Sequence, residues 1–174
     1  MQIRAFDEDE TDGVRQLLDA AFDGVAESRI VRALRAADAD TLELVAEDHG
    51  RIVGEIMFAP VTGRTTSGTE LYGIGLGPVA VAPDVQKRGI GSALIEHGLE
   101  YLKKLGVPFC VLLGDPAYYK RFGFTPARDI NWFWEADPEA TYGDAFQLLS
   151  LSGAPIDVTH VTIAYHAAFA ADED

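Results

Sequence analysis

An uninterrupted apolar run, VPFCVLLG at residues 107–114, is the feature that most limits what this chain can fold into. Such a run is typical of a strand buried on both faces, because a strand with one face in water alternates apolar and polar residues. A sheet that contains this strand needs other elements packed against both of its sides. The run therefore favours a layered α/β protein.

Extended and amphipathic segments precede that run. Residues 2–6, QIRAF, are typical of a strand, and apolar residues then recur twice at helical spacing, with the second helix expected after Ser28. The stretches TLELVAED and RIVGEIMFAPV meet at His49-Gly50, which predicts a hairpin. The stretch ELYGIGLGPVAV is expected to be a third long strand.

A long helix is predicted from Lys87 or Arg88 to Leu105, and Gly106 is placed to end it. Two lysines in its last turn suit the negative end of a helix dipole. We expect the single cysteine, Cys110, and the helix histidine to be packed in the core. The predicted apolar face of this helix comprises Ile90, Leu94, His97, Tyr101 and Leu105.

A short helix is expected in DPAYYKRF, with Asp115 as its N-cap. Extended segments then close the chain, in DINWFWEA, AFQLLSL and VTHVTIAYH. Trp132 and Trp134 share one face of their strand, where core packing is the main expectation and an acceptor pocket or a dimer interface stays open. The whole order predicts an α/β fold with a mixed central sheet of about seven strands and about four helices. It lacks the steady strand–helix alternation of a doubly wound dinucleotide fold.

Composition limits the class of protein. A length of 174 residues without repeats or linkers predicts one domain over 1–174. A single cysteine cannot form an internal disulfide, and the four histidines are too scattered to predict a metal site. We find neither a long apolar run typical of a membrane span nor a start typical of a signal peptide. We therefore expect the protein in the cytoplasm. The net charge of −14 argues against nucleic acid as a partner. The simpler explanation of this charge is a solvated acidic surface that keeps the protein soluble. The alternative is that the acidic residues attract a cationic acceptor.

Two glycines stand at the start of the long helix, in DVQKRGIGSAL. Glycine destabilises a helix by about 1 kcal/mol against alanine, so Gly89 and Gly91 indicate a place that needs bare backbone. The first amides of a helix have no intrahelical acceptor and can hold a diphosphate, provided that no Cβ blocks it. Gln86, Lys87 and Arg88 add polar and cationic groups. A tight helix start without a ligand is the alternative.

The strand before this helix changes the phase of its large residues at Gly77-Pro78. A shift of one residue turns every side chain to the other face, and a β-bulge is the usual way to absorb it. We therefore expect a bulge that splays the strand and leaves backbone groups near Val79 unpaired, where an extended ligand with amide groups could add as a strand does. An edge strand interrupted by proline is the alternative. The nearby glycines match neither a Walker loop nor the dinucleotide fingerprint.

These segments together resemble the GNAT superfamily of N-acetyltransferases, and nearly the whole chain is similar to its YhbS-like branch. The resemblance rests on LGPVAVAPDV, then QKRGIGSAL, then VLLGDPAYYKRFGF, with AESRIVRALR near the start and VTIAYH near the end. It implies the GNAT fold, with the bulged strand splayed at the coenzyme A site. It also implies acetyl-CoA as co-substrate, without a metal. The residues that it assigns to the coenzyme are Val79, Ala80, Val81, Gln86, Lys87, Arg88, Gly89, Ile90, Gly91, Ser92 and Tyr119.

The resemblance also assigns catalytic roles. Tyr119 corresponds to the family's tyrosine that shares or gives a proton to the leaving thiolate, while Tyr118 corresponds to the preceding aromatic residue and is expected to pack. A backbone N–H released by the bulge, that of Val79, is expected to stabilise the oxyanion. The base that takes the proton of the amine is open between Glu70, at the head of the bulged strand, and Glu27, before the second helix.

The resemblance therefore implies direct transfer of an acetyl group from acetyl-CoA to a primary amine in a ternary complex. The partners expected are acetyl-CoA and a small-molecule or peptide amine, with a homodimer open. One alternative is a longer acyl-CoA or an acyl carrier protein as donor. Another is a regulatory module that binds coenzyme A without catalysis. The acceptor itself is not predicted.

Overall fold

The computed structural model describes residues 1–39 and 41–170 of the chain. It divides into two compact units. The first unit comprises Met1–Ala59, Leu76–Tyr101 and His166–Asp174, and the second comprises Pro60–Gly75 and Leu102–Tyr165. Two long strands, β3 (Arg51–Thr65) and β4 (Glu70–Val81), contribute residues to both units.

The sheet of the first unit is antiparallel. Strand β1 (Gln2–Ala5) pairs with β2 (Leu42–Asp48), and β2 pairs with the first half of β3. The β2–β3 turn at His49-Gly50 was predicted and is confirmed, with φ of 51° and 75°. The amide of Ala82 donates to the Val53 carbonyl at 2.9 Å, which joins the end of β4 to β3.

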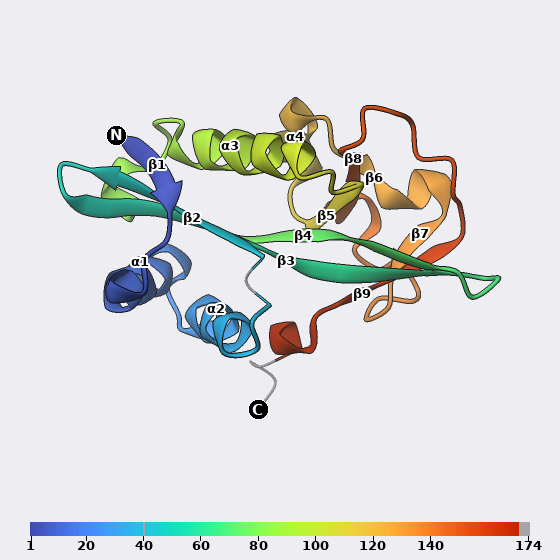
Figure 1. Cartoon of the computed structure of the whole chain (residues 1–174), viewed down its shortest axis with the longest axis horizontal. Helices are drawn as coiled ribbons and strands as arrows, with labels where there is room; N and C mark the ends of the chain where they lie inside the picture. Colours follow the sequence, from blue (N-terminus) through green and yellow to red (C-terminus); the bar gives the residue numbers. More distant parts are fainter. Residues whose placement is uncertain (40, 171–174) are drawn as a thin grey trace. The chain divides into compact units, whose positions relative to one another are not determined.

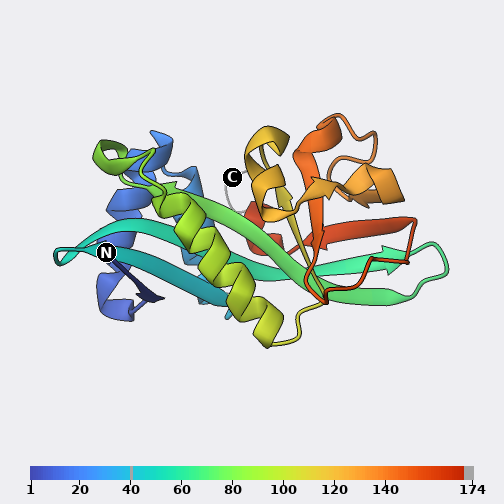
Figure 2. The same cartoon turned by 90° about the horizontal axis from the view of Figure 1, so that it is seen from above.

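Helices cover both faces of this sheet. Figure 1 and Figure 2 show α1 (Thr11–Phe22) and α2 (Ala26–Ala36) on one side and α3 (Ile90–Lys104) on the other. Alternation along β3 explains the two layers, because Met57 packs with α1 and α2 while Gly54 meets α3. A Cβ on Gly54 would lie 2.9 Å from Ile90 and from Leu94, so glycine is what lets α3 approach the strand.

The apolar face predicted for the long helix is partly wrong. Tyr101 is 47% exposed, Leu105 is 60% exposed, and His97 is exposed rather than packed in the core. The buried face of α3 is wider than the predicted apolar face and is rotated to one side of it. The C-terminal residues of the predicted face, Tyr101 and Leu105, are therefore exposed to solvent. The buried apolar side chains of α3 are those of Ile90, Leu94, Ile95, Leu99 and Leu102. The helix also begins at Ile90, later than predicted, while Gly106, with φ of 79°, follows its end as expected.

The second unit is built around β5 (Phe109–Leu113). This strand runs parallel to β4 and antiparallel to β8 (Phe146–Ser150). Its first four residues are buried, which confirms the prediction for the apolar run, and Cys110 is a buried core residue. Strand β9 (Val161–Tyr165) pairs with β3 and with β7 (Trp132–Trp134), and β6 (Thr125–Pro126) pairs with β8.

Short elements complete the chain. Residues 1–39 and 41–170 hold nine strands rather than about seven, because β6 and β7 are short, and four α-helices as predicted. The second helix begins at Ala26, before Ser28. Trp132 is buried and packs edge-to-face on Phe109, which confirms core packing for this residue. None of the helices described has the length and apolar character needed to cross a bilayer. The remaining elements are α4 (Pro116–Tyr119) and the 3-10 turns η1 (Glu8–Glu10), η2 (Pro83–Val85), η3 (Lys120–Phe122), η4 (Ala127–Ile130), η5 (Gly143–Ala145) and η6 (Ala167–Ala170).

Candidate functional site

The start of α3 exposes bare backbone. Gly89 has φ of 84°, a region that side chains disfavour, and no atom lies within 4 Å of where its Cβ would be. The Ala93 amide donates to the Gly89 carbonyl at 3.0 Å, so helical bonding begins only there. Amides before this point, such as those of Ile90 and Gly91, have no intrahelical acceptor. The helix start therefore has the geometry of an anion site and fits a diphosphate.

The loop before this helix start is held by specific contacts. Arg51 donates to both carboxylate oxygens of Asp84 at 2.7 and 2.8 Å, which ties η2 to the first residue of β3. The Gln86 side-chain amide donates to the Val81 carbonyl at 3.1 Å, and Arg88 donates to the Asp84 carbonyl at 3.5 Å. Lys87 is exposed and has φ of 62°. The loop thus presents cationic side chains beside the open helix start.

At the end of β4, one edge faces β3, and on the other edge the Val81 carbonyl accepts from the Gln86 side chain. The bond from Ala82 to Val53 directs alternate backbone groups toward β3, so those of Val79 and Val81 point to the opposite edge. Among the described residues, the ladder of β4 with β5 includes only Ile74 and Gly75. Ala80 is buried in the core against α1 and α2. The edge at residues 79–81 can therefore receive an extended ligand as an additional strand would bind.

The dipeptide at which the sequence predicts a β-bulge, Gly77-Pro78, lies within β4. Gly77 has φ of 141°, and the Gly77-Pro78 peptide bond is cis. Proline also removes one backbone donor from the strand at this point. Whether the ladder here takes the form of a β-bulge stays a prediction.

Tyr119 belongs to the second unit, at the end of α4. The Asp115 carboxylate accepts from the Ala117 amide at 2.9 Å, which confirms the predicted N-cap. The ring of Tyr119 lies against Gly114, where a Cβ would be 2.5 Å from it, and 5.9 Å from the ring of Phe124. Burial, with smaller contributions from neighbouring Tyr118 and Cys110, raises the pKa of Tyr119 to about 12. The phenol is therefore protonated at neutral pH and available as a donor.

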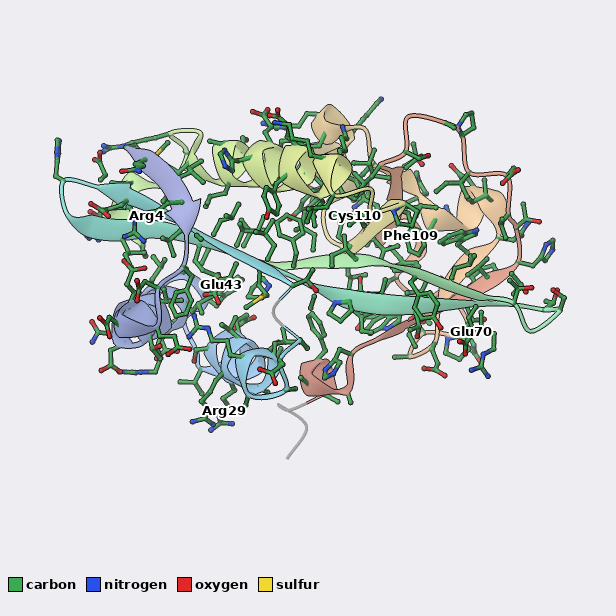
Figure 3. All side chains as sticks on the ribbon, in the orientation of Figure 1. Arg4, Arg29, Glu43, Glu70, Phe109 and Cys110 are labelled. Carbon is green, nitrogen blue, oxygen red and sulfur yellow. The ribbon has the colours of Figure 1, made fainter. Side chains whose placement is uncertain are left out.

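The two candidate bases differ in their surroundings. Glu70 is exposed in the second unit (Figure 3). Hydrogen bonds from Tyr72 at 2.6 Å and Arg64 at 3.2 Å lower its pKa. A lower pKa makes a carboxylate a weaker base, so this environment favours a surface ion pair. Glu27 lies half-buried in the first turn of α2 and makes no hydrogen bond or ion pair with the described residues.

Glu55 is the most deeply buried acid among the described residues, and the sequence did not predict its place in the core. Glu55 on β3 is fully buried, and neither of its carboxylate oxygens has a hydrogen-bond partner. Burial first, and then the negative charge of Glu43, raise its pKa well above the ordinary value, against a smaller opposite effect of Arg35. Arg35 binds Glu43 through both of its carboxylate oxygens, one at 2.8 Å, and stacks on Phe6 at 3.8 Å. The signal in the sequence was an acid within the apolar stretch VGEIMF.

Comparison with known proteins adds independent findings. The family described as acetyltransferase (GNAT) domain matches residues 2–127. The chain is 33% identical over 160 residues to the uncharacterized N-acetyltransferase YhbS of Escherichia coli K12, covering 90% of this chain and 91% of that protein. The crystal structure of Escherichia coli YhbS in complex with CoA superposes with a TM-score of 0.86 at 32% identity, over 97% of this chain and 91% of that one.

A second solved structure is similar at higher sequence identity. It is a GNAT family acetyltransferase from Brucella melitensis in complex with acetyl-CoA, with 40% identity, a TM-score of 0.75 and coverage of 97% of both chains. The fold expected from the sequence is confirmed by both structural likenesses.

Proposed function

Because this chain belongs to the GNAT family of acetyltransferases, we propose that it transfers the acetyl group of acetyl-CoA directly to a primary amine, within one complex of protein, donor and acceptor. The observation that carries the proposal is the open start of α3 at Gly89, which fits the diphosphate of the coenzyme. The proposal treats residues 1–174 as one GNAT domain that works in the cytoplasm.

In this proposal the first unit holds the coenzyme. The edge of β4 at Val79, Ala80 and Val81 binds the amides of the pantetheine arm. The loop from Gln86 to Gly89 and the first turn of α3 at residues 90–92, with Ser92, hold the diphosphate. Gln86 carries no charge, so Lys87 and Arg88 supply the positive charge of this loop. Because Gln86 donates to the Val81 carbonyl, its side chain must turn away if the arm is to use that acceptor.

Bound acetyl-CoA supplies a thioester carbonyl and a thiolate leaving group. The Val79 amide donates a hydrogen bond to the carbonyl oxygen as negative charge builds on it. The Tyr119 hydroxyl donates to the departing sulfur. With a pKa of about 12 against about 8.5 for a free thiol, full proton transfer from the phenol is unfavourable, so Tyr119 stabilises the thiolate chiefly as a hydrogen-bond donor.

Removal of the amine proton needs a base. Glu27 is the better of the two candidates, because it makes no competing ion pair within the described part of the chain, whereas Glu70 is held by Arg64 and Tyr72. A carboxylate can act through one water molecule, so direct contact with the amine is not required.

A thiol-release assay with acetyl-CoA and a panel of metabolite amines, antibiotics and peptides tests the proposal. Turnover with at least one amine, and acetylation of that amine by mass spectrometry, is the expected result. Parallel wells with longer acyl-CoA donors test the size of the acyl group. Binding of CoA by calorimetry without turnover on any acceptor would instead assign the chain to coenzyme sensing, and absence of both would refute the proposal.

A further inference from the structure

Gln147 is a buried polar residue of the second unit to which the proposed reaction gives no role. It lies on β8, where it is 1% exposed and stands opposite Leu112 of β5. Its neighbours along the strand, Phe146 and Leu148, are apolar core residues. Burial of an amide is unfavourable unless its donors are hydrogen-bonded, so the bonds of this side chain indicate what it does there.

The amide group of Gln147 holds the turn between β5 and α4. Its Nε2 donates to the Gly114 carbonyl at 3.0 Å and to the Ala145 carbonyl at 3.3 Å. The Gly114 amide donates to the same Ala145 carbonyl at 2.9 Å. Gly114 is therefore hydrogen-bonded through both its N–H and its carbonyl to residues at the start of β8. These bonds fix the orientation of the peptide that joins Gly114 to Asp115.

The position of Tyr119 depends on this peptide. Helix α4 has four residues, and so short a helix is not stable on its own, so the contacts at its ends determine where it lies. The Tyr119 amide donates to the Asp115 carbonyl at 3.1 Å. The Tyr119 ring lies against the bare backbone of Gly114, where a Cβ would be 2.5 Å from it. A rotation of the peptide at Gly114 would therefore displace both the start of α4 and the surface that supports the ring.

We propose that Gln147 is a positioning residue, which holds the Gly114 peptide so that the Tyr119 hydroxyl stays where the departing thiolate needs a donor. This inference rests on the proposed function, in which Tyr119 donates to the sulfur. Gln147 itself touches neither substrate and acts only through the turn. Since a small misplacement of a catalytic group lowers the rate of the chemical step, loss of the amide lowers kcat and leaves the KM for acetyl-CoA unchanged.

Gln147→Met tests the amide, because methionine is also unbranched and of similar length but has no N–H donor. In the thiol-release assay with the best amine of the panel, kcat is expected to fall about tenfold, with a KM for acetyl-CoA within about twofold of the native value. An unchanged kcat would overturn the inference.

Trp132→Phe is the matched control for this variant. It also removes a buried donor to a backbone carbonyl, that of Trp132 Nε1 to Val158 at 2.7 Å, but on β7, whose ladder partner is β9. It is expected to keep the native kcat. Unfolding temperatures of both variants verify that they are folded. An equal fall of kcat in the two variants would assign the effect to lost stability and would overturn the inference.

A double variant shows whether Gln147 acts through Tyr119. Residues that act as a unit have non-additive effects, so Gln147→Met is expected to change the kcat of Tyr119→Phe by less than about twofold. A further tenfold fall would mean that Gln147 acts by another route and would overturn the inference. A native kcat in Tyr119→Phe alone would refute the catalytic role of Tyr119 and, with it, the need to position its hydroxyl.

Amide hydrogen exchange measures the position of the turn without catalysis. Gln147→Met is expected to speed exchange of the Gly114 and Tyr119 amides at least about tenfold, because local opening then breaks fewer bonds. The Val161 amide, which donates to the Asn131 carbonyl at 3.1 Å, should exchange as in the native chain. Unchanged exchange at Gly114 and Tyr119 would overturn the inference even in an active acetyltransferase. Faster exchange in a chain that acetylates no amine would refute the proposed function and confirm that Gln147 holds this turn.

Discussion

Glu55 lies directly opposite Val45 in the ladder of β3 with β2, so its carboxyl group is placed within the apolar layer under α1 and α2. Neither oxygen is hydrogen-bonded, and the charges that act on this carboxyl group are those of Glu43 and Arg35. Figure 3 shows Glu43 between the strands and these helices. Because Arg35 already binds Glu43, a second negative charge on Glu55 would lack a partner, and burial therefore favours the neutral form of this carboxyl group.

Glu55→Gln is expected to make the chain more stable above about pH 5 and to leave stability near pH 4 little changed. The pKa of Glu55 is raised on folding above its ordinary value of 4.5, so below that pH both states are protonated. As the pH rises, Glu55 ionises first in the unfolded state. The free energy of unfolding of the native chain then falls by up to about 1.4 kcal/mol per pH unit, until the pH reaches the pKa of Glu55 in the folded state. Chemical denaturation at several pH values measures this slope. Parallel curves for the variant and the native chain would contradict the protonated state.

Glu43→Gln is expected to act in the opposite direction. The Arg35 guanidinium is mostly buried, and removal of its partner leaves an unpaired positive charge, which destabilises a protein by about 3–5 kcal/mol. Urea denaturation at pH 7 measures the loss. Arg51→Ala, which breaks an exposed ion pair of the same unit, provides the comparison, with an expected change of about 1 kcal/mol or less. Equal losses in the two variants would mean that burial does not set the strength of the Arg35–Glu43 pair.

Periodicity predicted most of the fold because the elements of this chain bury regular faces. The hairpin at His49-Gly50, the buried strand around Cys110 and the N-cap at Asp115 all follow from local residue types, and all are confirmed. The face of α3 was harder to predict. The side of α3 that is buried depends on its close contact with β3 at Gly54, where the strand has no side chain. This contact is a feature of tertiary packing and cannot be read from the helix sequence.

The candidate site was predictable only where it depends on local backbone. At position 89 the residue type itself indicates a positive φ, because glycine is the residue that adopts it readily. The direction in which the backbone groups of Val79 point depends instead on which residues of β4 are hydrogen-bonded to β3. Glu55 could not be located in the core from sequence alone, since one residue of register decides whether it faces helices or solvent. The assignments of Tyr119, Glu27 and Glu70 to the reaction stay predictions.

Gly89→Ala is expected to weaken CoA binding about tenfold or more, because an alanine at φ of 84° is strained and its Cβ occupies open space at the anion site. Gly153→Ala is the matched control, since Gly153 also has a positive φ, of 78°, and no atom near its Cβ position. Both variants should lose similar stability, roughly 1 kcal/mol. Calorimetry with CoA separates them, and a Gly89→Ala variant with native affinity would remove this loop from the coenzyme site.

Arg51→Ala is expected to raise the KM for acetyl-CoA about threefold to tenfold while leaving kcat nearly unchanged. Its two bonds to Asp84 hold η2, which leads directly into the loop at Gln86, so their loss lets the loop adopt other positions before the coenzyme binds. Arg128→Ala removes an ion pair of similar exposure in the second unit and should not change the KM. Steady-state kinetics with the best amine of the panel provides both constants. A fall in kcat at constant KM would instead place Arg51 in the chemical step.

Tyr119→Phe is expected to lower kcat by about two orders of magnitude or more and to change the affinity for CoA by less than about threefold. The variant keeps the ring that packs against Gly114 and Phe124 and removes only the hydroxyl donor. Tyr118→Phe is the control, because Arg121 stacks on that ring at 4.6 Å and the proposal gives its hydroxyl no role in the reaction. Since the pKa of Tyr119 is about 12, the Tyr119 hydroxyl does not ionise between pH 8 and 10. Any fall of kcat in that range should therefore occur at the same pH in Tyr119→Phe, with lower kcat values throughout. A basic limb that disappears in this variant would show that Tyr119 titrates in that range and acts as a full proton donor rather than as a hydrogen bond to the thiolate.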